Sequence, residues 1–175
     1  MIPDAPPSHW MKAENFPPSF QERIQCMAGF ISEGMTVMDL GCGPMRLKTH
    51  LPARCIYYGV DYIQRDEHTL LCDFNKGEFP SLHVDCIFCS GILEYIHDVE
   101  WFITEVCSHG RRCVLSYNTS DQFPSQTMRE SLHWVNQFSV SEVIRFFALH
   151  TFDLVHHSLT EEKEDIFVFQ EGRKA

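Results

Sequence analysis

Two aspartates and two glycines near the start of this 175-residue chain have the types and spacing of a nucleoside-binding turn. Asp39 lies at the end of an apolar run and is followed by Gly41 and Gly43, while Asp61 follows the next apolar run. Glycines at such a turn let the backbone approach a ligand without obstruction by a Cβ atom. A carboxylate after the second strand can accept hydrogen bonds from both ribose hydroxyls. The spacing therefore predicts a site for a cofactor that carries a nucleoside.

The elements that must position these residues alternate between strands and helices, which is typical of a parallel α/β sheet. Capping boxes and apolar spacing predict one helix that begins at Ser19 with Glu22 and continues towards Gly34, and another that begins at Ser139 with Glu142. A further helix is predicted between the fourth and fifth strands, ending before a glycine. We expect seven strands, at residues 36–40, 55–60, 69–72, 84–89, 113–117, 152–158 and 165–170.

The short connection at residues 160–164 decides the direction of the final pair of strands. A parallel crossover needs about a dozen residues or more, so these two strands must form an antiparallel hairpin. The predicted fold class is α/β, with a doubly wound, mostly parallel seven-stranded sheet, an antiparallel last strand and helices on both faces. We expect residues 1–34 to form an N-terminal segment and helix that either serve as a lid or pack against the edge of the sheet, and residues 35–175 to form the main domain of one compact unit.

Composition and charge disfavour several classes of partner. The net charge is -10, with 24 acidic residues against 14 Lys and Arg, and binding to nucleic acid requires a basic face. No apolar run approaches the length that crosses a bilayer, and the first residues lack the features of a signal peptide. We therefore expect a cytoplasmic protein with neither nucleic acid nor membrane as its partner.

The eight cysteines show no disulfide framework, and we expect reduced thiols. Cys86 and Cys89 come nearest to a metal-binding motif. Residues three apart in a strand point to opposite faces of the sheet, so these two thiols cannot share one zinc ion. We expect no metal site.

The order of motifs along residues 35–170 resembles the class I methyltransferases that use S-adenosylmethionine. The motifs stand at residues 37–43 in the first turn, 58–61 at the end of the second strand, 71–74 after the third, and 85–95 across and beyond the fourth. The resemblance implies S-adenosylmethionine as the cofactor and in-line transfer of its methyl group to a small molecule. Small-molecule methyltransferases of the quinone-biosynthesis or methionine-biosynthesis-associated type are the most similar group.

The resemblance also implies a role for each residue of these motifs. The first turn would surround the methionine moiety, Asp61 would accept the ribose hydroxyls, and Ser90 with the residues after it would line the methionine end. Asp73 would accept the adenine amino group, although the residues around it also have the composition of a plain turn. The cofactor-binding residues implied in this way are Asp39, Gly41, Cys42, Gly43, Asp61, Tyr62, Asp73, Phe74, Ser90 and Gly91.

The side that receives the methyl group is less sharply marked. His133 lies shortly before a predicted helix, at a place similar to that of a histidine in small-molecule methyltransferases, and is either a general base or part of a solvated loop. Glu94, Tyr95 and Asn118 follow strand ends, where ligands bind in open α/β sheets, but each also suits a cap. Trp10 either covers this site with the N-terminal segment or packs against the edge of the sheet.

The first turn departs from two known patterns. Met45 stands where the methyltransferases usually have a further glycine, and Pro44 before it is expected to open a helix with Leu47 packed inward. Arg46 stands where a dinucleotide-binding turn requires its third glycine, which disfavours a nicotinamide oxidoreductase. A noncatalytic protein that keeps the methyltransferase fold as a binding or scaffold subunit remains the alternative function.

Overall fold

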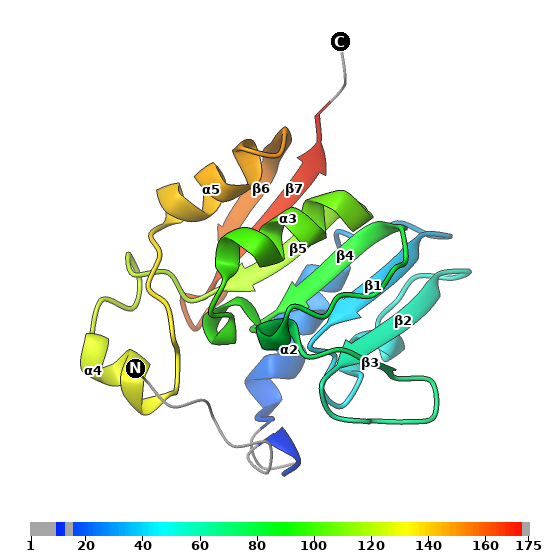
Figure 1. The fold of residues 1–175 in the computed structure, drawn as a ribbon, viewed down its shortest axis with the longest axis horizontal. Coiled ribbons are helices and arrows are strands. Elements are labelled where there is room, and N and C mark those ends of the chain that lie inside the picture. Colours follow the sequence, from blue (N-terminus) through cyan, green and yellow to red (C-terminus); the bar gives the residue numbers. More distant parts are fainter. Residues whose placement is uncertain (1–9, 13–15, 173–175) are drawn as a thin grey trace.

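A seven-stranded sheet forms the centre of the structure, a computed structural model that describes residues 10–12 and 16–172 (Figure 1). The strand order is β3-β2-β1-β4-β5-β7-β6. Strand β7 runs antiparallel to both of its neighbours, and all the other pairs are parallel. The strands are β1 (Thr36–Leu40), β2 (Ile56–Asp61), β3 (Leu70–Leu71), β4 (Val84–Ser90), β5 (Gly110–Tyr117), β6 (Phe152–Leu159) and β7 (Asp165–Glu171).

The predicted seven strands and the final antiparallel hairpin are confirmed. The largest shift of a boundary is in β5, which begins at Gly110 rather than at Cys113 because its first residues pair with β4 and β7 on either side. Strand β3 is shorter than predicted, since it lies at the edge of the sheet and pairs only with β2.

Helices cover both faces of the sheet, as predicted. One apolar core includes Phe102 and Phe147 from two helices, and the core on the opposite face includes Met27 from another. Cys89 belongs to the first core and Cys86 to the second, so these two thiols do point to opposite faces. No helix in the described part of the chain is long and apolar enough to cross a membrane. The helices are α2 (Pro18–Ala28), α3 (Val99–His109), α4 (Gln126–Ser131) and α5 (Val140–Ala148), with α3 in front of the sheet in Figure 1 and α2 behind it.

The two predicted capping boxes have different outcomes. The box of Ser139 and Glu142 is present at the start of α5. The box at Ser19 is wrong, because α2 begins at Pro18 without a side-chain cap, and Ser19 lies inside the helix. Proline suits the first helical position, since its fixed φ is already helical and its missing N–H would have no partner there. This helix also ends at Ala28, well before the predicted glycine.

The turn after β1 is tighter than predicted. The expected helix from Pro44 is wrong, and a short 3-10 helix spans Arg46–Thr49 instead, although Leu47 is buried as expected. Met45 has a φ of 56°, in the left-handed region, and this interrupts a helix that would begin at Pro44. Met45 thus adopts the backbone conformation that a glycine would favour, and the loop turns sharply without a glycine at this position.

Candidate cofactor and acceptor site

The turn after β1 lies between the end of β2 and the loop after β4. Gly41 and Gly43 have φ angles of 70° and 49°, in a region that residues other than glycine rarely adopt. The N–H groups of Gly41 and Cys42 donate to the Val60 carbonyl at 2.9 and 3.0 Å. A Cβ atom on Gly41 would come within 2.8 Å of Ile92 Cδ1. The backbone conformation therefore favours glycine at Gly41, and a Cβ atom there would have to displace the Ile92 side chain.

Asp61 is buried at the end of β2 and holds this turn in place. Its Oδ2 accepts hydrogen bonds from the Gly43 N–H and from Arg65 Nε, both at 3.0 Å, and its Oδ1 accepts one from the Ile63 N–H at 3.0 Å. A carboxylate offers about four acceptor positions. One position is left for a ribose hydroxyl, and a second hydroxyl could bind only if Arg65 moved.

Arg65 connects this carboxylate to the N-terminal segment. Its Nη1 donates to the Trp10 carbonyl at 2.8 Å, and its guanidinium lies 5.7 Å from the centre of the Phe16 ring. A Cβ atom on Gly43 would come within 2.9 Å of Phe16 Cε1. The Trp10 ring lies 5.8 Å from that of Phe16 and 5.2 Å from that of Tyr95. These two aromatic residues thus lie against the turn, while residues 1–9 and 13–15 of the predicted lid lie outside the described part of the chain.

Asp39 is a buried carboxyl group beside the turn. It accepts a hydrogen bond from the Tyr57 hydroxyl at 2.8 Å. Burial raises the pKa of Asp39 to about 7, and the nearby Asp61 also raises it, while the bond from Tyr57 lowers it. Burial likewise raises the pKa of Cys42 and of Tyr57, so both remain protonated at neutral pH. Asp39 is therefore a carboxyl group that a nearby cation would help to ionise.

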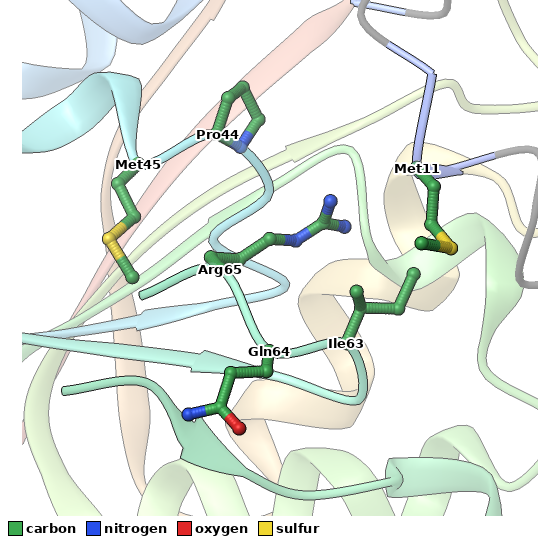
Figure 2. Close-up of a pocket in the computed structure, with 6 residues that line it drawn as sticks. All are labelled: Met11, Pro44, Met45, Ile63, Gln64 and Arg65. Atoms are coloured by element: carbon green, nitrogen blue, oxygen red, sulfur yellow. The ribbon is translucent and has the colours of Figure 1, made fainter. Parts of the chain in front are cut away.

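A hollow of about 320 Å³ lies beside the same turn. Figure 2 shows the Arg65 side chain extending between Pro44 and Met11. Met45 packs towards β2, where its Cε would lie 3.1 Å from a Cβ atom on Gly59. The hollow is therefore on the side of the turn that faces the residues after Asp61. Its lining consists of Met11, Pro44, Met45, Ile63, Gln64 and Arg65.

The remaining residues on the predicted adenine side lie at the ends of β2 and β3. Asp73 caps the short 3-10 helix Phe74–Lys76 and forms an ion pair with Lys76 at 2.9 Å, so it has the turn role that the sequence left open. Phe74 is buried, and Tyr62 is exposed. Binding of the adenine amino group by Asp73 would have to replace or add to these local contacts.

Glu94 lies after β4 and is buried next to the end of β5. Its Oε1 accepts hydrogen bonds from the Asn118 N–H at 2.9 Å and from Asn118 Nδ2 at 2.7 Å. Within the described residues, Glu94 Oε2 is the one side-chain polar atom sealed from solvent without a hydrogen-bond partner. A buried unpaired carboxylate oxygen is costly, so this atom needs a partner such as a bound water molecule or a ligand.

Aromatic side chains gather around Tyr95, the residue after Glu94. The Tyr95 ring meets the Trp10 ring edge-on, and the Tyr95 hydroxyl accepts a hydrogen bond from Trp134 Nε1 at 3.2 Å. Trp134 in turn packs edge-on against Phe123, with ring centres 5.9 Å apart. The four predicted acceptor residues thus form two contacts, between the rings of Trp10 and Tyr95 and between Glu94 and Asn118, and Glu94 and Tyr95 are adjacent in the sequence.

Arg129 positions this region, although the sequence does not predict it. It is buried in α4, and its guanidinium donates to the carbonyls of Asn118 at 2.7 Å and Asn136 at 3.0 Å and to the Tyr117 hydroxyl at 3.0 Å. No local pattern marks it, because all of these partners are oxygen atoms from other segments. The sequence also does not predict roles for Arg23, Tyr57 and Arg65, which bond Ser90, Asp39 and Asp61 respectively, or for Glu164, which pairs with Arg23.

His133 stands on the turn that follows α4. It has a φ of 60° and is partly exposed, and its N–H donates to the Glu130 carbonyl at 3.1 Å. The next residue, Trp134, belongs to the aromatic group beside Tyr95. His133 is therefore close along the chain to the acceptor side, and its role as a base stays a prediction.

Comparisons with known proteins agree with this architecture. Residues 10–157 match a family model described as a methyltransferase domain, and no curated protein sequence matches the chain. A putative methyltransferase from Haloferax volcanii, solved in complex with the Trm112 methyltransferase activator, has a TM-score of 0.80 at 14% identity, with 99% of this chain and 100% of that chain covered.

Two further solved structures contain S-adenosylhomocysteine. The 1,6-didemethyltoxoflavin-N1-methyltransferase of Burkholderia thailandensis has a TM-score of 0.73 at 11% identity, covering 94% of this chain and 84% of that one. Magnesium protoporphyrin IX methyltransferase of Synechocystis has a TM-score of 0.66 at 13% identity, covering 87% and 83%. The predictions of the fold, the enzyme class and S-adenosylmethionine as cofactor are confirmed. The chain belongs to the methyltransferase-domain family and is an S-adenosylmethionine-dependent methyltransferase of class I.

Proposed function

We propose that this enzyme methylates a small molecule that binds beside the carboxyl ends of β4 and β5. The observation that carries this proposal is the buried, unpaired Oε2 of Glu94, the residue directly before Tyr95, whose ring contacts that of Trp10. The aromatic surfaces suit a flat acceptor, and the carboxylate oxygen suits an N–H or O–H group on it. The loop that carries Glu94 starts beside Gly41, so the acceptor would lie next to the cofactor turn.

When bound, the cofactor would offer a methyl group on its sulfonium to an acceptor lone pair, with the carbon–sulfur bond breaking as the new bond forms and S-adenosylhomocysteine as the leaving group. The tasks of the chain are to align the two molecules and to exclude water. Asp39, Gly41, Cys42 and Gly43 would hold the methionine end, with Ser90 and Gly91 across from them. Asp61 and Tyr62 would hold the ribose, and Asp73 and Phe74 the adenine.

An acceptor that loses a proton during the reaction needs a base. We propose His133 for this role. Its support is its position next to Trp134 and histidine's general suitability for proton transfer near neutral pH. Asparagine tolerates a left-handed φ, so His133→Asn removes the imidazole with little backbone strain. We expect this variant to lose roughly a hundredfold in turnover with acceptors that must be deprotonated, and little with acceptors that carry no proton.

Two observations support an acceptor the size of a metabolite: the net charge of the chain and the names of similar solved structures. The net charge of -10 disfavours nucleic acid, and one similar structure is named for a toxoflavin precursor. Another similar protein is complexed with a protein activator. Binding of a protein partner to this chain should therefore be measured as well as binding of a small molecule. We also propose a cytoplasmic location. All eight cysteines are free thiols, and thiols stay reduced in a reducing compartment such as the cytoplasm.

The test has two stages. Calorimetric titration with S-adenosylhomocysteine should give a single site, and absence of binding would reject the proposal. Release of S-adenosylhomocysteine from S-adenosylmethionine should then be measured over a panel of flat amines, phenols and heterocycles. We expect turnover with at least one of these small molecules, and Glu94→Gln should reduce it.

The noncatalytic alternative draws support from Asp61, whose acceptor positions are mostly filled by the protein. Cofactor binding without turnover over the whole panel, together with retained binding to a protein partner, would favour it. In that case Glu94→Gln and His133→Asn would leave every measurable function unchanged.

A further inference from the structure

A buried arginine reaches the methionine end of the proposed cofactor site from outside the motifs. Arg23 comes from α2, and its side chain is only 5% exposed. Arginine is rarely buried unless its charge is paired, because removing a cation from water is costly. Arg23 forms an ion pair with Glu164, and its Nε donates to Ser90 Oγ at 3.0 Å. This arrangement joins α2 to the ends of two strands.

The third nitrogen of the Arg23 guanidinium, Nη2, differs from Nε and Nη1, which bond Ser90 and Glu164. In the described part of the chain, Arg23 Nη2 makes no hydrogen bond, yet it is not sealed from solvent. It lies over Gly91, where a Cβ atom would come within 2.9 Å of it, and Gly91 has a φ of 65°. The Phe20 ring supports the guanidinium at 4.4 Å from the ring centre. Two N–H groups are therefore held rigidly beside Ser90 and Gly91 and left available to a ligand.

We propose that Arg23 binds the carboxylate of the cofactor's methionine moiety. This inference rests on the proposed placement of that moiety between the first turn and Ser90. Guanidinium groups bind carboxylates with strong, directional hydrogen bonds.

The charges around Arg23 favour this ligand over a simple anion. Glu164 already pairs with Arg23, and Glu94 acts on Glu164 as a further negative charge. An ordinary anion would be repelled by this excess of acid. The methionine moiety of the cofactor carries an ammonium group next to its carboxylate. The acidic side chains can therefore attract the ammonium group while Arg23 binds the carboxylate.

The test compares two ligands that differ only in the carboxylate. S-adenosylhomocysteine and its decarboxylated analogue, which keeps the amine and the thioether, are titrated into the full chain by calorimetry. Wild type should bind S-adenosylhomocysteine at least tenfold more tightly than the analogue. Arg23→Gln should lose at least tenfold for S-adenosylhomocysteine and less than about twofold for the analogue.

Matched variants separate binding from folding. Arg112→Gln changes a partly buried arginine at the opposite end of β5, where it donates to Gln170 and the Phe30 carbonyl, and should leave both affinities unchanged. If Arg23→Gln does not fold, Arg23→Lys keeps the positive charge but not the planar fork, and it should narrow the difference between the two ligands.

Two results would overturn the inference. In one, wild type binds both ligands equally well. In the other, the difference between them persists in the Arg23 variants, so that Arg23 is only a structural ion-pair partner of Glu164. Failure of wild type to bind either ligand is a different result, because it rejects the proposed function itself.

Discussion

The two halves of the site are built in different ways. In the cofactor half, at the ends of β1 and β2, backbone N–H groups of the turn make the contacts: Gly41 and Cys42 donate to the Val60 carbonyl, and Gly43 donates to the Asp61 carboxylate. In the acceptor half, at the ends of β4 and β5, Glu94 bonds Asn118, Tyr95 bonds Trp134, and Arg129 ties the loop together from α4.

The difference has a physical cause. A turn that approaches a ligand closely demands particular backbone conformations, and these restrict the residue types at fixed spacing. A pocket for a particular acceptor needs only the right surface, and side chains from many segments can supply it. We therefore expect the cofactor half to vary little among proteins of this fold, and the acceptor half to carry the specificity.

The largest effect is expected from breaking the cofactor half at Asp61. Asp61→Asn removes the negative charge that pairs with Arg65 and the acceptor for the ribose, so affinity for S-adenosylhomocysteine should fall at least about a hundredfold. Titration calorimetry measures this, with circular dichroism to verify the fold. Glu67→Gln, an exposed change on the same loop, is the control. Unchanged affinity in a folded Asp61→Asn variant would contradict the assignment.

Two substitutions at Glu94 test the acceptor half. Glu94→Ala leaves both Asn118 donors buried without an acceptor, so the free energy of unfolding in urea should fall by about 3 kcal/mol. Glu94→Gln keeps one acceptor oxygen and should cost less than about 1 kcal/mol, yet turnover should fall about tenfold because an amide nitrogen replaces Oε2. If both variants lose stability equally, Oε2 has a structural role rather than a role towards the acceptor.

The pKa of Asp39 links cofactor affinity to pH. Its pKa of about 7 lies above the ordinary value of 3.8, so the unfolded chain ionises before the folded one, and stability falls as pH rises from about 4 to 7. The positive charges of S-adenosylmethionine favour the ionised carboxylate, so affinity should rise roughly tenfold from pH 6 to 8. Calorimetry in buffers of different ionisation enthalpy should also detect proton release at pH 6. Asp39→Asn should abolish both effects, and a slope that persists in this variant would identify another group.

The sheet could be predicted because apolar periodicity and the short final connection leave few alternatives. The start of α2 could not be predicted correctly, since Ser19 with Glu22 and Pro18 each suggest a different first residue and the sequence does not rank them. Arg23 did carry a signal, because it lies three residues after Phe20 and four before Met27, on the apolar face of the helix. Arg129 carried none.

The smallest effect is expected at Arg65. It tests whether the ion pair of Arg65 with Asp61 or the N-terminal segment over the turn limits cofactor affinity. Arg65→Gln frees Oδ2 of Asp61 for a second ribose hydroxyl, so affinity for S-adenosylhomocysteine should rise roughly two- to fivefold while thermal stability falls. Arg46→Gln is the matched control, because Arg46 donates to the carbonyls of Phe16 and Pro17 and does not touch Asp61. If Arg46→Gln raises affinity equally, the covering segment rather than the ion pair limits binding. If Arg65→Gln lowers affinity, Arg65 itself belongs to the cofactor half, and Asp61 binds the ribose through the one position that remains on Oδ1.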